Sequence, residues 1–166
     1  LDGQGEGTIT DNDDAPQLSI NDVTVDEGDG TANFTVSLSA ASGLPVSFTY
    51  ATADGSATDP DDYTGGSGSL TIAAGATTAT VSVPIIDDAL DEDAEHFFVD
   101  LSGAVNATIL DNQGKGTITD NDDAPKLSIN DVTVDEGAGT ANFTVSLSAA
   151  SGLPVTFNYA TADGTA

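Results

Sequence analysis

Alternation of apolar and polar residues dominates the middle of the chain. From residue 31 to residue 38 every second position is apolar, and the same period of two recurs in the segments that begin near Val46, Val81 and Phe97. A period of two places one side of an extended strand in a core and the other side in water. The alternation therefore predicts strands at residues 31–38, 46–50, 80–85 and 97–101, and no segment shows a helical period.

Shorter apolar segments predict further strands at residues 18–20, 23–25, 69–72 and 116–119. Glycine-containing turns separate the segments, as at Glu27–Gly30, Ser42–Gly43, Asp54–Gly55, Gly65–Gly66 and Ala74–Gly75. Short strands at this spacing, with turns between them, are typical of two packed antiparallel sheets. The sequence predicts an all-β fold, an immunoglobulin-like Greek-key β-sandwich of about seven strands in tandem repeats.

The repeat is visible in the sequence itself. Residues 1–57 align without a gap on residues 110–166, and only positions 3, 6, 17, 29, 47, 49 and 56 differ. Such closeness is typical of a tandem array. We interpret residues 1–16 as the C-terminal tail of one repeat, residues 17–123 as a complete repeat, and residues 124–166 as the N-terminal part of the next. We expect neighbouring repeats or chains of the same protein to complete the two partial repeats by strand addition.

The charge of the chain limits its partners. Acidic residues number 28 against two basic ones, and the formal net charge is −26. Nucleic acid is excluded as a natural partner, because its binding needs a basic face. No apolar run is long enough to insert directly into a membrane, and no cysteine is present for a thiolate metal site. Cations are the partners that this composition favours.

The acidic residues are grouped in the predicted loops, while the outward strand positions carry mainly Thr, Ser and Asn. The groups are Asp26–Glu27, Asp54, Asp59–Asp62, Asp87–Glu95 and Asp120–Asp123. Loops at alternate strand junctions gather at one end of a sandwich, so several groups are expected to converge there. Two carboxylates 4 Å apart repel by about 1 kcal/mol in water and about 4 kcal/mol at an effective dielectric near 20. Clustered hard oxygen ligands predict Ca²⁺, and a solvated acidic surface is the alternative.

Four motifs in the complete repeat resemble the successive motifs of the Calx-beta family: Asp26–Gly28, Tyr50–Tyr63, Ile85–Phe97 and Gly116–Asp123. The resemblance implies calcium sites at one end of the sandwich. Carried over by position, it implies carboxylate ligands at Glu27, Asp54, Asp87, Asp88, Glu92, Glu95, Asp120 and Asp122, and a backbone carbonyl ligand at Leu90. The partial repeats retain Asp11 and Asp13 in front and Glu136 and Asp163 behind. Asn121 stands where the exchanger domains of the family carry a third aspartate, which predicts a weaker or missing site.

Other motifs fit less well. Asp11–Pro16 is similar to a cadherin linker, but the other cadherin motifs are absent. The run Asp87–Glu95 lacks the turn glycine of an EF-hand loop. His96 is the single histidine, and no nucleophile motif accompanies it, so we expect no enzymatic activity and no catalytic residues.

Three functions follow as hypotheses. The first is a calcium-rigidified structural repeat in an extended extracellular or cell-surface protein, such as an adhesin or a fibre. Near-identical repeats without cysteine favour it. The second is a calcium-sensing regulatory domain, the role that the family plays beside membrane exchangers. The third is a module that recognises glycans or proteins, for which no exposed aromatic patch is predicted.

Overall fold

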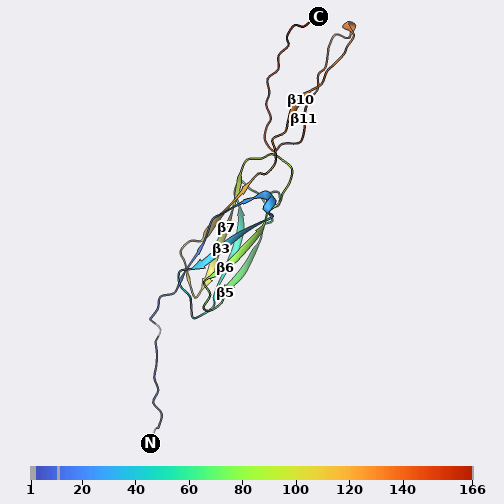
Figure 1. The fold of residues 1–166 in the computed structure, drawn as a ribbon. Helices are drawn as coiled ribbons and strands as arrows, with labels where there is room; N and C mark the ends of the chain where they lie inside the picture. The colour runs from blue at the N-terminus through green and yellow to red at the C-terminus, as the bar shows by residue number, and fades with distance from the viewer. Residues whose placement is uncertain (1–2, 11, 166) are drawn as a thin grey trace.

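The computed structural model describes residues 3–10 and 12–165, and its central part is a sandwich of two β-sheets (Figure 1). The smaller sheet has four strands in the order β6 (Thr78–Pro84), β3 (Thr31–Leu38), β1 (Gln17–Ile20) and β8 (Thr108–Ile109). The larger sheet has five strands in the order β2 (Val23–Asp26), β9 (Gln113–Thr119), β7 (Glu95–Val105), β4 (Val46–Asp54) and β5 (Ser67–Ile72). The predicted all-β immunoglobulin-like sandwich is confirmed.

Each strand predicted from the sequence has a counterpart, with shifted ends. The largest difference between predicted and observed bounds is in β7, which spans Glu95–Val105, whereas the alternation predicts a strand only at residues 97–101. Strand β8 was not predicted, because two residues are too few to show a period. Two short 3-10 helices, η1 (Glu27–Asp29) and η2 (Glu136–Ala138), were also not predicted. No helix among the described residues is long and apolar enough to cross a membrane.

The chain passes from one sheet to the other between β1 and β2. At this crossing the side-chain oxygen of Asn21 accepts a hydrogen bond from the Thr35 amide at 2.6 Å. The carboxylate of Asp22 accepts one from the Lys115 amide at 2.7 Å. The two side chains thus replace ladder bonds that the crossing interrupts, and they satisfy backbone donors of both sheets. The crossing allows β2 to pair in parallel with β9, which brings residue 27 next to residues 120–122.

The core lies between the sheets and is built from the inward residues of the alternating strands. The ring of Phe97 packs edge-on against Phe34 at 5.9 Å between centroids and is stacked on Tyr63 at 4.4 Å. These rings are buried, with Phe34 and Phe97 at 0% exposure. The other large buried side chains are Phe48, Leu18, Ile72, Val36, Val46, Val81 and Val99. Inward and outward positions follow the period of two that the sequence predicted.

Residues 124–165 extend beyond one end of the sandwich as a separate arm (Figure 1). Strands β10 (Leu127–Ile129) and β11 (Val145–Leu147) pair there with Leu127 opposite Leu147, the register of β1 and β3. Most large apolar residues of the arm are exposed, although most of their counterparts in the complete repeat are buried. Phe143 is 57% exposed, for example, and its counterpart Phe34 is 0% exposed. Among the described residues no second sheet covers the arm.

Candidate metal centre

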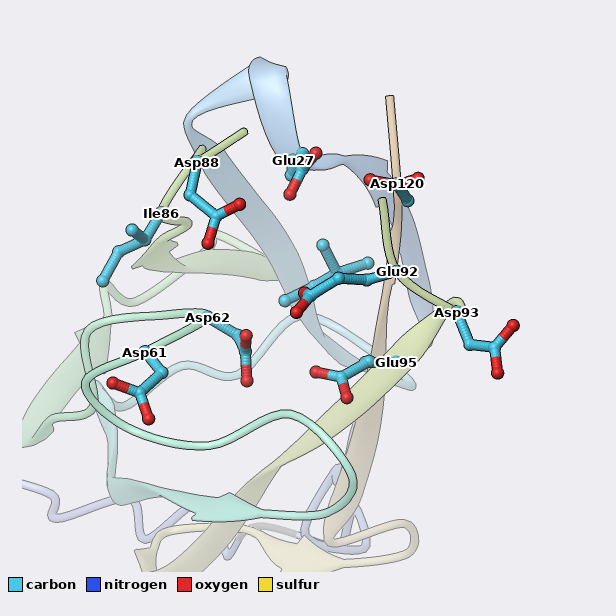
Figure 2. Close-up of a pocket in the computed structure, with 10 residues that line it drawn as sticks. Glu27, Asp61, Asp62, Ile86, Asp88, Glu92, Asp93, Glu95 and Asp120 are labelled. Atoms are coloured by element: carbon cyan, nitrogen blue, oxygen red, sulfur yellow. The ribbon is translucent and has the colours of Figure 1, made fainter. Parts of the chain in front are cut away.

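Loops that are far apart in the sequence bring their carboxylates together at one end of the sandwich (Figure 2). One loop follows β2, one lies between β4 and β5, one lies between β6 and β7, and the last follows β9. Ile86 and Ile118 supply apolar lining. The acidic residues that line this cavity, called the acidic cavity below, are Glu27, Asp61, Asp62, Asp88, Glu92, Asp93, Glu95 and Asp120. Carboxylates at this density repel one another unless protons or cations balance their charge, so the arrangement favours a bound cation.

A compact group of three carboxylates stands at this end. Glu27, Asp120 and Asp122 each offer one oxygen, and these oxygens lie within 4.8 Å of one another. Oxygens that share one Ca²⁺ at about 2.4 Å lie no more than about 4.8 Å apart, so the group fits a single ion. Oδ2 of Asp122 is buried without a hydrogen-bond donor, the one such side-chain atom found in the described part of the chain. A buried carboxylate oxygen without a donor indicates a cation as its partner.

Local sequence directs Glu27 inward. Asp26 caps the 3-10 helix η1 by accepting from the Gly28 amide at 3.1 Å. Asp29 completes the capping box, because its carboxylate accepts from the Asp26 amide at 3.1 Å. Glu27 is the first residue of this helix and is only 7% exposed. Its Oε1 accepts from the Asn121 amide at 3.2 Å, which ties it to the segment after β9.

Asn121 bridges two acidic groups. Its side-chain nitrogen donates to Oδ1 of Asp26 at 3.0 Å and to Oδ1 of Asp87 at 3.2 Å. One amide group thus holds two carboxylates that a cation could otherwise hold. Asp87 does not line the acidic cavity but is joined to its rim through this contact. That Asn121 weakens or removes a site stays a prediction.

Burial changes the acidity of the carboxyl groups around the cavity. Burial, reinforced by the charge of Asp120, raises the pKa of Glu27 to about 7. Burial also raises the pKa of Glu95 to about 7, with a hydrogen bond to Asp62 as the next cause. The pKa values of Glu92 and Asp122 are raised by the same loss of hydration and by neighbouring aspartates. Without a cation, protons therefore hold part of the cluster together.

Asp54 has a different environment. Its Oδ1 accepts from the Tyr63 hydroxyl at 2.6 Å and from the Asp59 amide at 3.1 Å. The tyrosine hydrogen bond is the largest cause that lowers the pKa of Asp54. The structure places Asp54 in a separate hollow with Thr52 and Gly65, outside the acidic cavity. In this structure Asp54 satisfies the hydroxyl of a buried tyrosine.

The remaining candidate ligands that the structure describes lie outside the acidic cavity. Leu90 does not line it, and its amide donates to Oδ1 of Asp88 at 2.7 Å. Asp13 lies beside the loop after β3, while Glu136 and Asp163 are exposed on the arm. Asp11 lies outside the described residues. The sequence reasoning missed three cavity residues, although each belongs to an acidic run that it noted: Asp61, Asp62 and Asp93.

The raised pKa values give the calcium-free protein a specific pH dependence. The pKa of Glu27 and of Glu95 rises from an ordinary value of 4.5 to about 7. Their contribution to stability is fully present below about pH 4.5 and is lost as the pH rises through about 7. In a chelator the sandwich is therefore expected to melt at a lower temperature at about pH 8 than at about pH 5, measured by differential scanning calorimetry.

Glu27→Gln is expected to flatten part of this dependence, because an amide does not titrate. Glu136→Gln changes the equivalent, exposed residue of the arm and is the control. A melting temperature that rises from about pH 5 to about pH 8 in chelator would contradict the assignment.

Comparisons with known proteins agree with the geometry. The family profile of the Calx-beta domain matches residues 11–124 and again residues 120–166. Sodium/calcium exchanger 2 of Homo sapiens is 33% identical over an alignment that covers 87% of this chain and 16% of the exchanger. The Rattus norvegicus protein of the same name is 35% identical, over 70% of this chain and 15% of the exchanger. The chain thus spans about one sixth of the length of these relatives.

Solved structures share the fold. The crystal structure of the apo-form Calx CBD1 domain superposes with a TM-score of 0.61 at 23% identity, covering 66% of this chain and all of that domain. The calcium binding domain CBD12 of CALX1.1 gives a TM-score of 0.60 at 24% identity, covering 69% of this chain and 50% of that one. At such identities the likeness establishes the sandwich fold alone.

Proposed function

Because the chain belongs to the Calx-beta domain family, we propose that it works as a calcium-binding module that senses calcium on behalf of a larger protein. The family is one of non-catalytic binding domains. The observation that carries the proposal is the group of Glu27, Asp120 and Asp122, with its buried oxygen that lacks a donor.

The chemistry of the cavity selects the ion. Each charged donor there is a carboxylate, and the chain contains no cysteine and only one histidine. Ca²⁺ accepts six to eight oxygen ligands in flexible geometry, whereas Mg²⁺ requires a tighter octahedron and Zn²⁺ prefers nitrogen or sulfur. Glu27 and Asp120 would hold the ion from the C-terminal ends of the paired strands β2 and β9. Glu92, from the loop between β6 and β7, and Glu95, at the start of β7, would supply further oxygens. Calcium is therefore the best-fitting occupant.

Two features support a sensing role. The relatives with sequence similarity are sodium/calcium exchangers, and the structural relatives include a domain described as calcium binding. The candidate ligands also come from three separate loops, which follow β2, precede β7 and follow β9. An ion that bridges them would link the loop between β6 and β7 to the segment after β9. Binding would thus alter the geometry where one repeat leads into the next.

Isothermal titration of calcium into the chain tests the proposal. Glu27→Gln keeps an acceptor for the Asn121 amide but removes one charge, so affinity is expected to fall on the order of tenfold or more. Glu136→Gln removes the equivalent carboxylate from the exposed arm and is expected to leave the affinity of that site unchanged. Equal affinities for the three proteins would rule out Glu27 as a ligand.

A second function is favoured by the repeat itself. Positions 1–57 and 110–166 differ at only seven places, and such uniformity suits a rigid spacer in an extended extracellular or cell-surface protein. The same titration separates the two functions. A dissociation constant of about a micromolar favours the sensor, and one of about a millimolar favours the spacer. The hypothesis of glycan or protein recognition has no supporting observation.

A further inference from the structure

A second contact joins the complete repeat to the arm, apart from the covalent linker. The Gly152 amide donates to the Asp91 carbonyl at 3.1 Å, and an isolated parallel bridge pairs Asp91 with Ser151. The Ser151 hydroxyl adds longer contacts of 3.4 Å to the carbonyl and to the carboxylate of Asp91. Asp91 belongs to the loop between β6 and β7, and Ser151 to the loop after β11. The two loops come from different repeats.

The glycine at this contact has a neighbour that its own repeat does not provide. A Cβ atom added to Gly152 would overlap Oε1 of Glu92 and lie 2.7 Å from its Cγ. Gly43 is the equivalent residue of the complete repeat, and a Cβ atom there would meet nothing within 4 Å. Neither glycine has the positive φ that excludes other residues. A larger residue at position 152 would therefore have to displace the Glu92 side chain of the preceding repeat or move the loop away from it, whereas one at position 43 would meet open space.

The loop is held in shape before it meets a partner. In the complete repeat the Ser42 carbonyl accepts from the Gly75 amide at 2.9 Å, and the Pro45 carbonyl accepts from the Asn106 side chain at 2.8 Å. The Leu44 amide donates to the Ser42 hydroxyl at 3.0 Å, and the Leu153 amide makes the same bond to Ser151 at 3.1 Å. A loop that is already ordered loses little entropy when it docks.

We propose that the loop Ser42–Pro45, repeated as Ser151–Pro154, is the element by which each repeat docks on the Asp91–Glu92 loop of the repeat before it. The partner that fits the exposed loop 42–45 is thus another copy of the repeat. Leu44 is 59% exposed, and the described tail of the preceding repeat does not include the counterpart of the Asp91–Glu92 loop. Because the linker from β9 to β10 is short, the two loops meet at high effective concentration, and a few weak bonds suffice. The docked loop and the covalent linker are two attachment points, and together they set the angle between consecutive repeats.

Distance measurements between spin labels on the full chain test this proposal. The chain has no cysteine, so Thr80→Cys on β6 and Ser146→Cys on β11 place one exposed label on each repeat. With the glycines intact, a narrow distance distribution is expected. Gly152→Ala is expected to broaden it, because the alanine methyl group crowds the Glu92 side chain and weakens the docked arrangement.

Gly43→Ala is the matched control, since it places the same methyl group in the same local sequence but in open space. It is expected to leave the distribution unchanged, and both variants are expected to keep the melting temperature of the complete repeat. Amide exchange adds a second readout: the backbone amide at position 152, which donates to the Asp91 carbonyl, is expected to lose protection in Gly152→Ala. Equal distributions for the Gly152→Ala and Gly43→Ala chains would overturn the proposal. Measurements in calcium and in chelator show whether docking depends on the metal, because Glu92 also lines the acidic cavity.

Discussion

Removal of calcium is expected to lower the melting temperature of the complete repeat by about ten degrees or more. An ion that binds only the folded state stabilises it by about 2.7 kcal/mol per site at a hundredfold excess over the dissociation constant. For a domain of roughly one hundred residues, each kcal/mol shifts the melting temperature by about 4–8 °C. Calorimetry of the chain in calcium and in chelator measures the difference.

Repulsion within the group of Glu27, Asp120 and Asp122 is the physical reason for an effect of this size. Glu27, Asp120 and Asp122 hold oxygens within 4.8 Å of one another, and chelation leaves their charges unbalanced except where protons bind. High NaCl is the control. Salt screens repulsion between exposed groups without coordinating the oxygens, so it is expected to restore only part of the loss. Identical melting temperatures in calcium and in chelator would argue against the metal centre as a whole.

Truncation of one core phenylalanine is expected to reduce the free energy of unfolding of the sandwich far more than truncation of its equivalent in the arm. Phe34 is fully buried and packs edge-on against Phe97. Phe34→Ala is expected to reduce the free energy of unfolding by about 3–5 kcal/mol, through lost burial and the cavity that remains. Phe143→Ala alters a side chain that is 57% exposed, and a change within about 0.5 kcal/mol is expected.

Urea unfolding, followed by the circular dichroism of the sheets, measures both variants. The two positions share their neighbours along the sequence, from Thr31–Leu38 to Thr140–Leu147. The local strand propensity is therefore the same at both positions, and any difference between the two losses of stability reports tertiary packing alone. A similar loss in the two variants would mean that the arm is packed as tightly as the complete repeat in solution.

Several features of the protein follow from the sequence by itself. The alternation at residues 31–38 specifies which side chains of β3 face a core, because the side-chain period of a strand is a local property. The grouping of acids in turns predicts that carboxylates converge, because loops at alternate junctions share one end of a sandwich. The cavity lined by Glu27, Asp88, Glu92, Glu95 and Asp120 has that arrangement.

Only the tertiary structure decided which acidic residues line the cavity. Asp54 ends β4 and Asp62 lies in the loop that follows, yet of these two only Asp62 reaches the cavity. Asp54 turns to the Tyr63 hydroxyl, and this contact depends on the stacking of Tyr63 over Phe97 in the core. The bridge from Asn121 to Asp26 and Asp87 likewise joins segments more than thirty positions apart. No pattern in the sequence reports such distances.

Comparing the near-identical copies separates what local sequence determines from what tertiary packing determines. Short-range hydrogen bonds recur in both: Asn21 with Thr35 and Asn130 with Thr144 each form at 2.6 Å. The turn bonds at Ser42 and Ser151 recur as well. Burial does not recur, because the apolar face of the arm needs strands equivalent to β6, β7 and β9, and among the described residues only the complete repeat has such strands packed against it. Sequence determines which residues are able to form a core, and only partners from distant parts of the chain remove them from water.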